Sequence, residues 1–480
     1  MSETLTTAPG EAGCATRQAD VVVVGSGVSG SAAALQAARA GARVVLVEKN
    51  ASPGGSAALS AGMFWTAPDL RAYNRRIPLG KPGHGAALVN DYAEAVDELR
   101  SMGVRVAEEP TRDIMTFGIG YSTDIHGILD FCRQQVLAHG GEVLTGTPVV
   151  DLLMDGVVPG SGVSGVTVRR PHGGLLEVRA GAVVLATGGF QGDPAELNRH
   201  MGPNADRLLF RSNPGSVGDA LRFGRRAGAG SSTGMSTFYG HLLPWPVRQF
   251  TAEQFLPYSQ YYSGHTVLVN LRGERFTDET LGDELLNQDL TFQPEARGVL
   301  IFDDHVRRTE ATQEPFPGLG VVDRFATAIE AGGRHHTAET LGELLDEVSR
   351  WGVDRAHLGA TLEAYRQAAE NGGGSARGIP VAQGARAPRT GPFHALMVQP
   401  SITFTFGGLP TSTDGEVLDP DARPVPGLFA AGADAGGLSN YGYAGGLAPG
   451  YITGRWAGRS AARAARASGQ NENREQGKHA

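Results

Sequence analysis

The first ordered part of the chain alternates strand and helix patterns. Residues 19–25 (ADVVVVG) form a continuous run of β-branched residues, which is typical of a strand buried on both faces. The alanine-rich segment 31–41 has helical spacing, and residues 42–49 (ARVVLVEK) repeat the buried-strand pattern. A glycine-rich turn joins the first strand to the helix. This order predicts a βαβ unit and therefore an α/β fold.

Strand patterns continue to about residue 190 and return near the end of the chain. Residues 121–140 predict a helix, and residues 141–190 predict several strands that end in the buried run 182–186. From about Ser401, short strand-like runs separated by glycine turns return. We therefore expect these two parts of the chain to form one domain.

The segment between them differs in composition and in its pattern of apolar residues. Aromatic residues cluster at its start, and amphipathic helices are predicted near residues 341–351 and 358–371. We therefore predict a discontinuous domain made of residues 1–233 and 399–480, split by an inserted α+β domain at residues 234–398.

The polar ends of the chain are expected to be disordered. Residues 1–18 lack the basic start and apolar run of a signal peptide and are interpreted as a leader. The tail from about residue 467 is also polar. No stretch approaches about 18 consecutive apolar residues, so we predict no membrane-spanning helix.

Composition excludes several classes of protein. A net charge of -8 with scattered arginines argues against a nucleic-acid partner. The two cysteines, Cys14 and Cys132, are too few for a disulfide framework or a cysteine-rich metal site, so we expect no metal and a cytoplasmic location. Glycine is abundant, 69 of 480 residues, without the period of collagen, which indicates many tight turns or close backbone approaches.

One glycine cluster matches the G-x-G-x-x-G motif between the first strand and helix. Gly25 allows a tight turn, Gly27 lets the backbone approach a pyrophosphate, and Gly30 lets the helix pack on the strand. The helix N-terminus then offers amides and partial positive charge to the anion. Glu48, at the end of the second strand, is placed to accept hydrogen bonds from ribose hydroxyls. The motif predicts a Rossmann-like site for an adenine dinucleotide.

Further glycine segments favour FAD over NAD. A second glycine loop at residues 49–56 follows the ribose site, and residues 186–190 and 426–437 end other strands in glycine turns. A flavin extends past the pyrophosphate and needs such additional backbone contacts, whereas a domain that binds only NAD does not. No second G-x-G-x-x-G unit is evident, so reduction of the flavin by substrate is favoured over direct oxidation of NAD(P)H.

These segments together resemble the FAD-dependent family that contains fumarate reductase flavoprotein, tricarballylate dehydrogenase and 3-ketosteroid dehydrogenases. The matching segments follow family order over most of the chain: GSGVSG…VVLVEK, PGGSAALSAG, LATGGFQGD, NPGSVGDALRFGRRAGA, VLVNLRGERFTDE and PGLFAAGADAGG…NYGYAGGLAPGYITGRWAG. The resemblance implies a Rossmann-like FAD-binding domain split by the inserted capping (substrate) domain, with FAD and a small-molecule substrate between them. It also implies an electron donor or acceptor, which stays unidentified.

The motifs and the resemblance assign residues to FAD. The resemblance implies that Gly446 and Leu447 line the pyrimidine edge of the flavin, and that Asp219 and Asp434 hold the ribityl chain or nearby loops, with helix or turn capping as the alternative for both. The full predicted set is Gly25, Ser26, Gly27, Val28, Ser29, Gly30, Glu48, Lys49, Gly54, Gly55, Ser56, Ser60, Ala61, Gly62, Val149, Ala186, Thr187, Gly188, Asp219, Gly432, Asp434, Gly446 and Leu447.

The resemblance also shows which substrate ligands are missing. Fumarate reductases hold a dicarboxylate with histidines and arginines, but Phe404 stands at one histidine position and Tyr441 or Tyr443, depending on the count, at one arginine position. The proton-donating arginine falls near Asp283, and only His241 is retained. A dicarboxylate is therefore disfavoured. It would need a nearby cation, for which the candidates are Arg211, Arg272 and Arg275.

The 3-ketosteroid dehydrogenases match these positions better. The resemblance implies that Tyr441 and the Gly445 amide polarise a substrate carbonyl, which stabilises the enolate formed when a neighbouring proton is removed. Steroid enzymes follow this tyrosine with Pro-Gly, whereas Gly442 and Tyr443 stand here. A second tyrosine is the base in that family. The candidates for the base are Tyr121, Tyr239, Tyr261, Tyr262 and His241.

The sequence therefore predicts an FAD-dependent oxidoreductase for a CH–CH bond next to a carbonyl, working as a dehydrogenase or in reverse on a fairly apolar, cyclic or steroid-like ketone. One alternative is a succinate-, fumarate- or tricarballylate-like carboxylate. Another is a flavin-binding protein without turnover.

Overall fold

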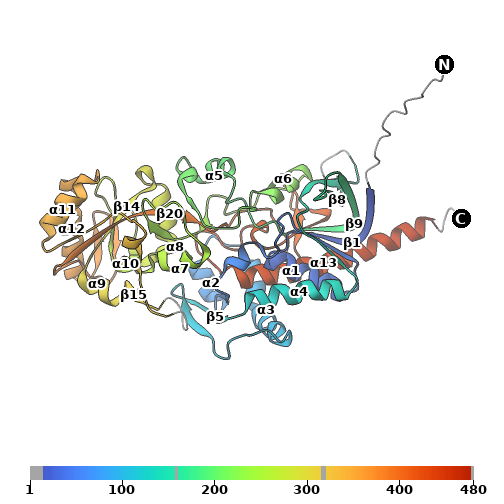
Figure 1. Cartoon of the computed structure of the whole chain (residues 1–480), viewed down its shortest axis with the longest axis horizontal. Coiled ribbons are helices and arrows are strands. Elements are labelled where there is room, and N and C mark those ends of the chain that lie inside the picture. Colours follow the sequence, from blue (N-terminus) through green and yellow to red (C-terminus); the bar gives the residue numbers. More distant parts are fainter. Residues whose placement is uncertain (1–14, 157–159, 315–319, 477–480) are drawn as a thin grey trace, which may run out of the picture.

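The computed structural model describes residues 15–156, 160–314 and 320–476, and side chains as far as Ser468. Two large sheets dominate, one near each end of the elongated molecule, and the first and last described segments both lie at the end that holds the first sheet (Figure 1). The α/β class predicted from the sequence is confirmed. Within the described ranges, no helix combines the length and apolar character needed to cross a bilayer.

The first sheet has eight strands. In the centre of the sheet, β1 pairs in parallel with both β2 and β9, and β2 pairs in parallel with β6. The strands are β1 (Ala15–Val24), β2 (Val44–Val47), β6 (Glu142–Leu144), β7 (Val149–Met154), β8 (Val163–Arg169), β9 (Leu175–Leu185), β22 (Glu416–Leu418) and β23 (Pro424–Ala430).

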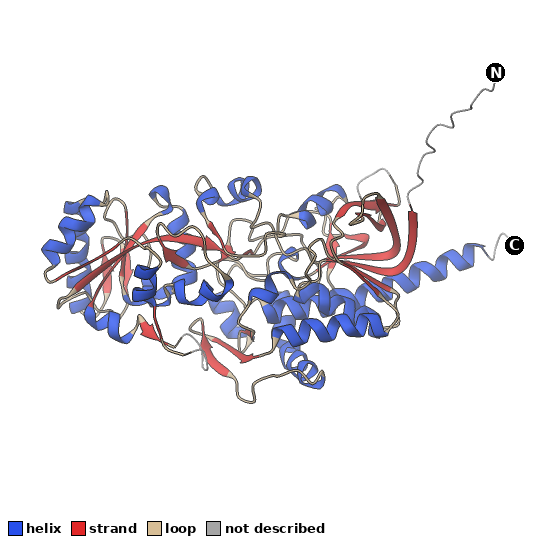
Figure 2. Cartoon of the chain, viewed as in Figure 1, coloured by secondary structure: helices blue, strands red, loops and turns tan. Residues whose placement is uncertain are grey.

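Helices α1 (Val28–Arg39) and α13 (Leu447–Gln476) lie side by side on one face of this sheet (Figures 1 and 2). Their backbones approach closely, since a Cβ atom added at Gly458 would collide with the carbonyl oxygen of Ala33. Helices α3 (Pro82–Ser101) and α4 (Ile125–Ala138) pack outside them. Small residues on both central helices therefore allow the close layer that covers the sheet.

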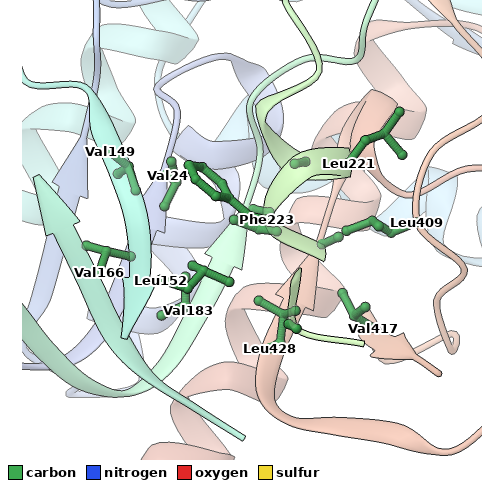
Figure 3. Close-up of a cluster of buried hydrophobic side chains, with 14 of the residues drawn as sticks. Val24, Val149, Leu152, Val166, Val183, Leu221, Phe223, Leu409, Val417 and Leu428 are labelled. Atoms are coloured by element: carbon green, nitrogen blue, oxygen red, sulfur yellow. The ribbon is translucent and has the colours of Figure 1, made fainter. Parts of the chain in front are cut away.

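The opposite face carries a second apolar cluster. Val149, Leu152 and Val166 from the β7–β8 arm face Leu221 and Phe223 from α6 (Asp219–Arg226), and Leu409, Val417 and Leu428 complete the cluster (Figure 3). Burying these side chains on folding stabilises the layer by roughly 1.5–3 kcal/mol for each fully buried residue.

The second sheet contains strands β12 (Leu242–Pro244), β13 (Val267–Asn270), β14 (Gly298–Asp303), β17 (His335–Ala338) and β20 (Phe393–Ile402), with the short strand β10 (Leu209–Phe210) at its edge. Alternate residues of its strands face two apolar clusters. One face is covered by α11 (Leu341–Arg350) and α12 (Arg355–Glu370), and the other by α8 (Asp283–Thr291) and α10 (Arg324–Glu330).

The predicted helices near residues 341–351 and 358–371 correspond to α11 and α12. The boundaries of the inserted domain stay a proposal. Strand β20 runs without a break across the boundary drawn at residue 398, and it pairs with β10, which precedes the boundary drawn at residue 233.

Two expectations about the chain ends were wrong where the structure describes them. Residues Ala15–Gln18 belong to β1, because the long strand β9 offers backbone partners from Leu176 to Arg179. Residues 1–14 lie outside the described residues. Helix α13 continues to Gln476, past the predicted start of disorder at 467, since the added segment contains no proline to stop it.

Candidate functional site

A cavity of about 550 Å³ opens at the carboxyl ends of β1 and β2. Loops that follow the parallel strands line one part of it, and residues near the end of β20 line another. In open α/β sheets, ligands bind at this edge of the strands.

The N-terminus of α1 faces the cavity without a side-chain cap. Gly27 is the N-cap residue, and the first turn contains no acidic residue. A Cβ atom added at Gly27 would have only the Gly54 carbonyl oxygen near it, at 4.0 Å, whereas one at Gly25, where φ is +102°, would collide with the backbone of Ala186. Gly27 therefore leaves open space in front of free helix amides, as a pyrophosphate requires.

Glu48 is fixed at the wall of the cavity. Its Oε2 accepts hydrogen bonds from the Ser26 backbone N–H (3.0 Å) and hydroxyl (2.7 Å), and its Oε1 accepts one from the Asn50 N–H (2.9 Å). A carboxylate has about four acceptor positions, so Glu48 can still accept a ribose hydroxyl. Next to it, Lys49 Nζ forms an ion pair with Asp219 at 2.6 Å.

Most of the residues predicted to bind FAD line this one cavity. They are Gly25, Ser26, Gly27, Val28, Ser29, Glu48, Lys49, Gly55, Ser56, Ser60, Ala61, Val149, Ala186, Thr187, Gly188, Asp219, Gly432, Gly446 and Leu447. Gly446 and Leu447 lie where α13 begins, so a second helix N-terminus faces the cavity.

Four residues of the predicted set do not line the cavity, namely Gly30, Gly54, Gly62 and Asp434. Asp434 is buried and accepts hydrogen bonds from the Thr187 hydroxyl (2.9 Å) and the Gly189 backbone N–H (2.9 Å). This aspartate therefore holds the glycine turn after β9 in place. The cavity as a whole fits FAD, because it joins an uncapped helix N-terminus, a ribose-facing acid and glycine-rich walls.

Aromatic rings enclose another part of the cavity. Strand β11 (Phe238–Tyr239) pairs with β21 (Phe404–Thr405), which places Tyr239 opposite Phe404. The Tyr239 and Tyr443 rings are stacked with centroids 3.9 Å apart, and Trp65 meets Tyr443 edge-on at 5.1 Å. Such walls favour a flat, apolar ligand.

Behind Tyr239, three side chains form a hydrogen-bonded chain. The Tyr239 hydroxyl lies 2.7 Å from His241 Nε2, and His241 Nδ1 contacts Asp283 Oδ2. The Leu242 backbone N–H donates to the other oxygen of Asp283 at 3.1 Å. Because Asp283 accepts at both oxygens, Nδ1 carries the imidazole proton, and Nε2 is left to accept the tyrosine proton.

Burial sets the protonation of this chain. Burial lowers the pKa of His241, and the charge of Arg211 lowers it further, while Asp283 opposes the shift. Burial also raises the pKa of Tyr239 well above its ordinary value, and the neighbouring Tyr443 adds to the effect. At neutral pH the pair is therefore a neutral tyrosine beside a neutral histidine.

Arg211 enters the cavity next to this chain. Its backbone N–H donates to the Ile402 carbonyl oxygen at 2.9 Å, at the end of β20, and the side chain is only 5% exposed. Nη2 donates to the Phe255 carbonyl oxygen at 3.1 Å, and the guanidinium lies 4.9 Å from the centre of the Phe255 ring. Its Nε and Nη1 have no acceptor among the described residues.

The structure separates the predicted catalytic residues. Tyr239, Tyr443 and Gly445 line the cavity, and His241 lies directly behind Tyr239. Tyr441 does not line it. Its hydroxyl lies 3.5 Å from Asp289, its φ is +63°, and burial raises its pKa to about 12.

Tyr121 also lies away from the cavity, with the Arg100 guanidinium 4.9 Å from the centre of its ring. Of the remaining base candidates, Tyr261 lines the cavity and Tyr262 is buried in the core of the second sheet.

Sequence reasoning did not assign a role to Asp283, and it named Arg211 only as one of three candidate cations. No local motif marks Asp283, because its partner His241 is 42 residues away. Of the other two arginines, Arg275 is paired with Glu279 and Arg272 is exposed. Neither lines the cavity.

Comparisons with known proteins agree with this geometry. Residues 20–447 match the family described as FAD binding domain. The chain is 30% identical over 496 residues to the NADH:fumarate oxidoreductase of Klebsiella pneumoniae (strain 342), with 97% of this chain and 50% of that enzyme covered. This chain thus spans half the length of that relative.

Two further similarities cover nearly whole proteins. The vinyl phenol reductase of Lactiplantibacillus plantarum is 29% identical, with 92% of this chain and 96% of that enzyme covered. The crystal structure of the 3-ketosteroid-Δ4-(5α)-dehydrogenase from Rhodococcus jostii RHA1 is 23% identical with a TM-score of 0.72, covering 93% of this chain and 97% of that one, and so shares the fold.

Proposed function

From the premise that the chain belongs to the FAD-binding domain family and has FAD as its cofactor, we propose that it is an oxidoreductase for a carbon–carbon bond next to a carbonyl group. Fumarate and vinyl phenol, named in two relatives, both contain a carbon–carbon double bond. The substrate we propose is fairly apolar and contains a ring, because aromatic side chains enclose the cavity beside Tyr239.

The observation that carries this proposal is the chain from Tyr239 through His241 to Asp283. In the direction of dehydrogenation, the Tyr239 oxygen takes a proton from the substrate carbon next to the carbonyl, while the Tyr239 hydroxyl proton passes to His241 Nε2. Asp283 then stabilises the imidazolium. In the reducing direction the same proton returns to the substrate by the reverse path.

FAD, when bound, takes or supplies the second hydrogen together with its electron pair. The protein's own contribution is to hold the reacting carbon against Tyr239, to exclude water with aromatic walls, and to polarise the carbonyl. The Gly445 backbone N–H, at the start of α13, remains our candidate for polarising the carbonyl.

Anaerobic reduction of the bound flavin tests the function. Loss of the oxidised flavin absorbance on adding ketosteroids, cyclic ketones, or saturated carboxylates such as succinate and 3-phenylpropanoate would identify the carbonyl compound that is dehydrogenated. The reverse assay uses chemically reduced enzyme and the unsaturated partners. If neither direction responds to any of these compounds, the protein binds FAD without turnover and the proposal is wrong.

A ketosteroid-like substrate and a carboxylate are the two forms of this proposal. The aromatic walls support a ring in either case, and the buried Arg211 supports an acid group, as developed below. The cytoplasmic location and the unidentified electron partner stay predictions.

A further inference from the structure

Arg211 is a buried cation that is held in place but not neutralised. The Phe255 carbonyl oxygen and ring fix one side of the guanidinium. The described residues form no ion pair with it, and its Nε and Nη1 lack acceptors. A guanidinium cannot lose its proton at physiological pH, so a charge this buried is costly unless an anion joins it.

The acids that line the cavity are engaged elsewhere. Glu48 is held by Ser26 and Asn50, and Asp219 is paired with Lys49. Glu253 is exposed, and a hydrogen bond from Thr251 lowers its pKa, so its charge is already stabilised without Arg211. Asp283, behind the cavity, is held by His241 and the Leu242 N–H. No described carboxylate is therefore paired with Arg211, so an anion that enters with a ligand can join it.

Arg211 also lies at the reacting end of the cavity, not at the dinucleotide end. Its charge acts on the pKa of His241, Tyr239 and Tyr443. Thr403 also lines the cavity, and its buried hydroxyl has no partner among the residues the structure describes. The Thr403 backbone N–H donates to the Tyr239 carbonyl oxygen at 2.7 Å, so this hydroxyl belongs to the same wall.

We propose that Arg211 binds the single carboxylate of a ring-bearing substrate and thereby selects an aryl- or cyclic-substituted unsaturated acid, or its saturated product, over a neutral ketone. This inference rests on the proposed function, whose substrate class it specifies. The carboxylate pairs with the Arg211 guanidinium through charge-assisted hydrogen bonds, and the ring lies among Tyr239, Tyr443 and Phe404.

A dicarboxylate does not suit the same site. The cations among the described residues that line the cavity are Lys49 and Arg211, and Lys49 is paired with Asp219. A second carboxylate would therefore lie against aromatic rings without a counter-charge, which is unfavourable. A steroid ketone would in turn leave Arg211 unpaired.

Binding to the oxidised holoenzyme tests the inference without requiring turnover. Cinnamate and its neutral isostere cinnamamide are titrated by calorimetry and by the change they cause in the bound flavin spectrum. Wild type should bind cinnamate at least about tenfold more tightly than cinnamamide and more tightly than fumarate. Arg211→Gln should weaken the binding of cinnamate by about tenfold or more and change the affinity for cinnamamide by no more than about twofold.

Matched variants separate the possible causes. Arg211→Lys keeps the charge but loses the planar donors, so it should weaken the binding of cinnamate less than Arg211→Gln does. Arg272→Gln removes an exposed arginine and should change neither affinity. If the Arg211 variants do not fold, comparing the affinities of wild type for cinnamate and cinnamamide still tests the inference.

Several outcomes overturn the inference. One is that wild type binds cinnamate and cinnamamide with equal affinity. Another is that wild type does not bind cinnamate. A third is that Arg211→Gln loses the same factor of affinity for both ligands. A changed spectrum of the ligand-free Arg211→Gln flavin without any change in cinnamate preference would assign the cation to FAD instead. Tight, Arg211-dependent binding of cinnamate without turnover would support the anion site while contradicting the proposed function.

Discussion

The Tyr239 hydroxyl donates to His241 Nε2 over 2.7 Å, and only the tyrosine of this pair lines the cavity. Tyr239 is therefore the residue that can touch a substrate, and His241 acts through it. This division of roles leads to predictions for each member of the chain.

Replacing Tyr239 with phenylalanine removes the proton carrier while keeping the stacked ring. We expect kcat to fall by about 100-fold or more, with FAD content unchanged. The measurement is single-turnover reduction of the bound flavin. Tyr262→Phe is the matched control, because its buried hydroxyl has no partner among the described residues and lies outside the cavity. Equal rates in wild type and Tyr239→Phe would exclude the tyrosine as proton carrier.

Asp283→Asn tests the orienting carboxylate through the pH profile. Asp283 opposes the lowering of the His241 pKa by burial, so losing its charge should lower that pKa further. Dehydrogenation needs neutral His241, and its rate falls as pH drops through this pKa. The acidic limb of kcat should therefore move to lower pH in Asp283→Asn, and the plateau should fall by at least about tenfold. A purely structural aspartate would lower the plateau without moving the limb.

Tyr441→Phe tests the role that the sequence assigned to this residue. Its hydroxyl lies 3.5 Å from Asp289, and its side chain does not line the cavity. We expect turnover within about threefold of wild type, together with a lower stability. A loss of about 100-fold with intact FAD would instead restore Tyr441 as the group that polarises the carbonyl.

The buried carboxyl of Glu284 should make the stability of the folded protein depend on pH. Burial raises its pKa to about 8, above the ordinary value of about 4.3. A raised folded-state pKa means that the contribution to stability is complete below about pH 4.3 and is lost as pH rises toward 8. Glu284→Gln should remove this loss and be more stable than wild type at pH 8.5 by about 2–4 kcal/mol, but not at pH 5.

Urea unfolding at the two pH values measures the effect of Glu284→Gln. The exposed Glu108→Gln serves as the control and should leave the slope of stability against pH unchanged. A wild-type stability that does not fall between pH 5 and pH 8.5 relative to Glu284→Gln would show that the carboxyl is not buried in the folded protein.

Substitution of two glycines of the dinucleotide motif should have two different effects. A methyl group at Gly27 meets open space, so Gly27→Ala should leave the apoprotein melting temperature unchanged and weaken FAD binding by about tenfold or more. Gly25→Ala adds a methyl group that collides with Ala186 at a φ of +102°, so it should lower the stability of the apoprotein itself. Equal FAD affinity in Gly27→Ala would mean that no pyrophosphate lies at the start of α1.

The local pattern of the sequence was sufficient for the dinucleotide half of the site. A buried strand, a glycine turn and a helix are adjacent in the chain, so their geometry follows from residues 19–49. The long α11 and α12 were likewise predicted, because their apolar spacing is regular over several turns.

The reacting end of the cavity could not be predicted in this way. Asp283 meets His241 only because the start of α8 packs beside β12, which is a tertiary contact. Tyr441 looked equivalent to Tyr443 in the sequence, but the left-handed backbone at Tyr441 turns its hydroxyl toward Asp289. Arg211 stood out only when its unpaired nitrogens and burial were visible together.

Helices α1 and α13 pack together although they come from opposite ends of the chain, and the first turns of both line the cavity. During synthesis, the α1 side of the FAD site is therefore made long before the segment up to Gly450 that completes it. The enclosed site is therefore complete only once translation has passed this point. Until then the alanine surface of α1 lacks the cover that α13 provides, which leaves apolar surface exposed on the unfinished chain.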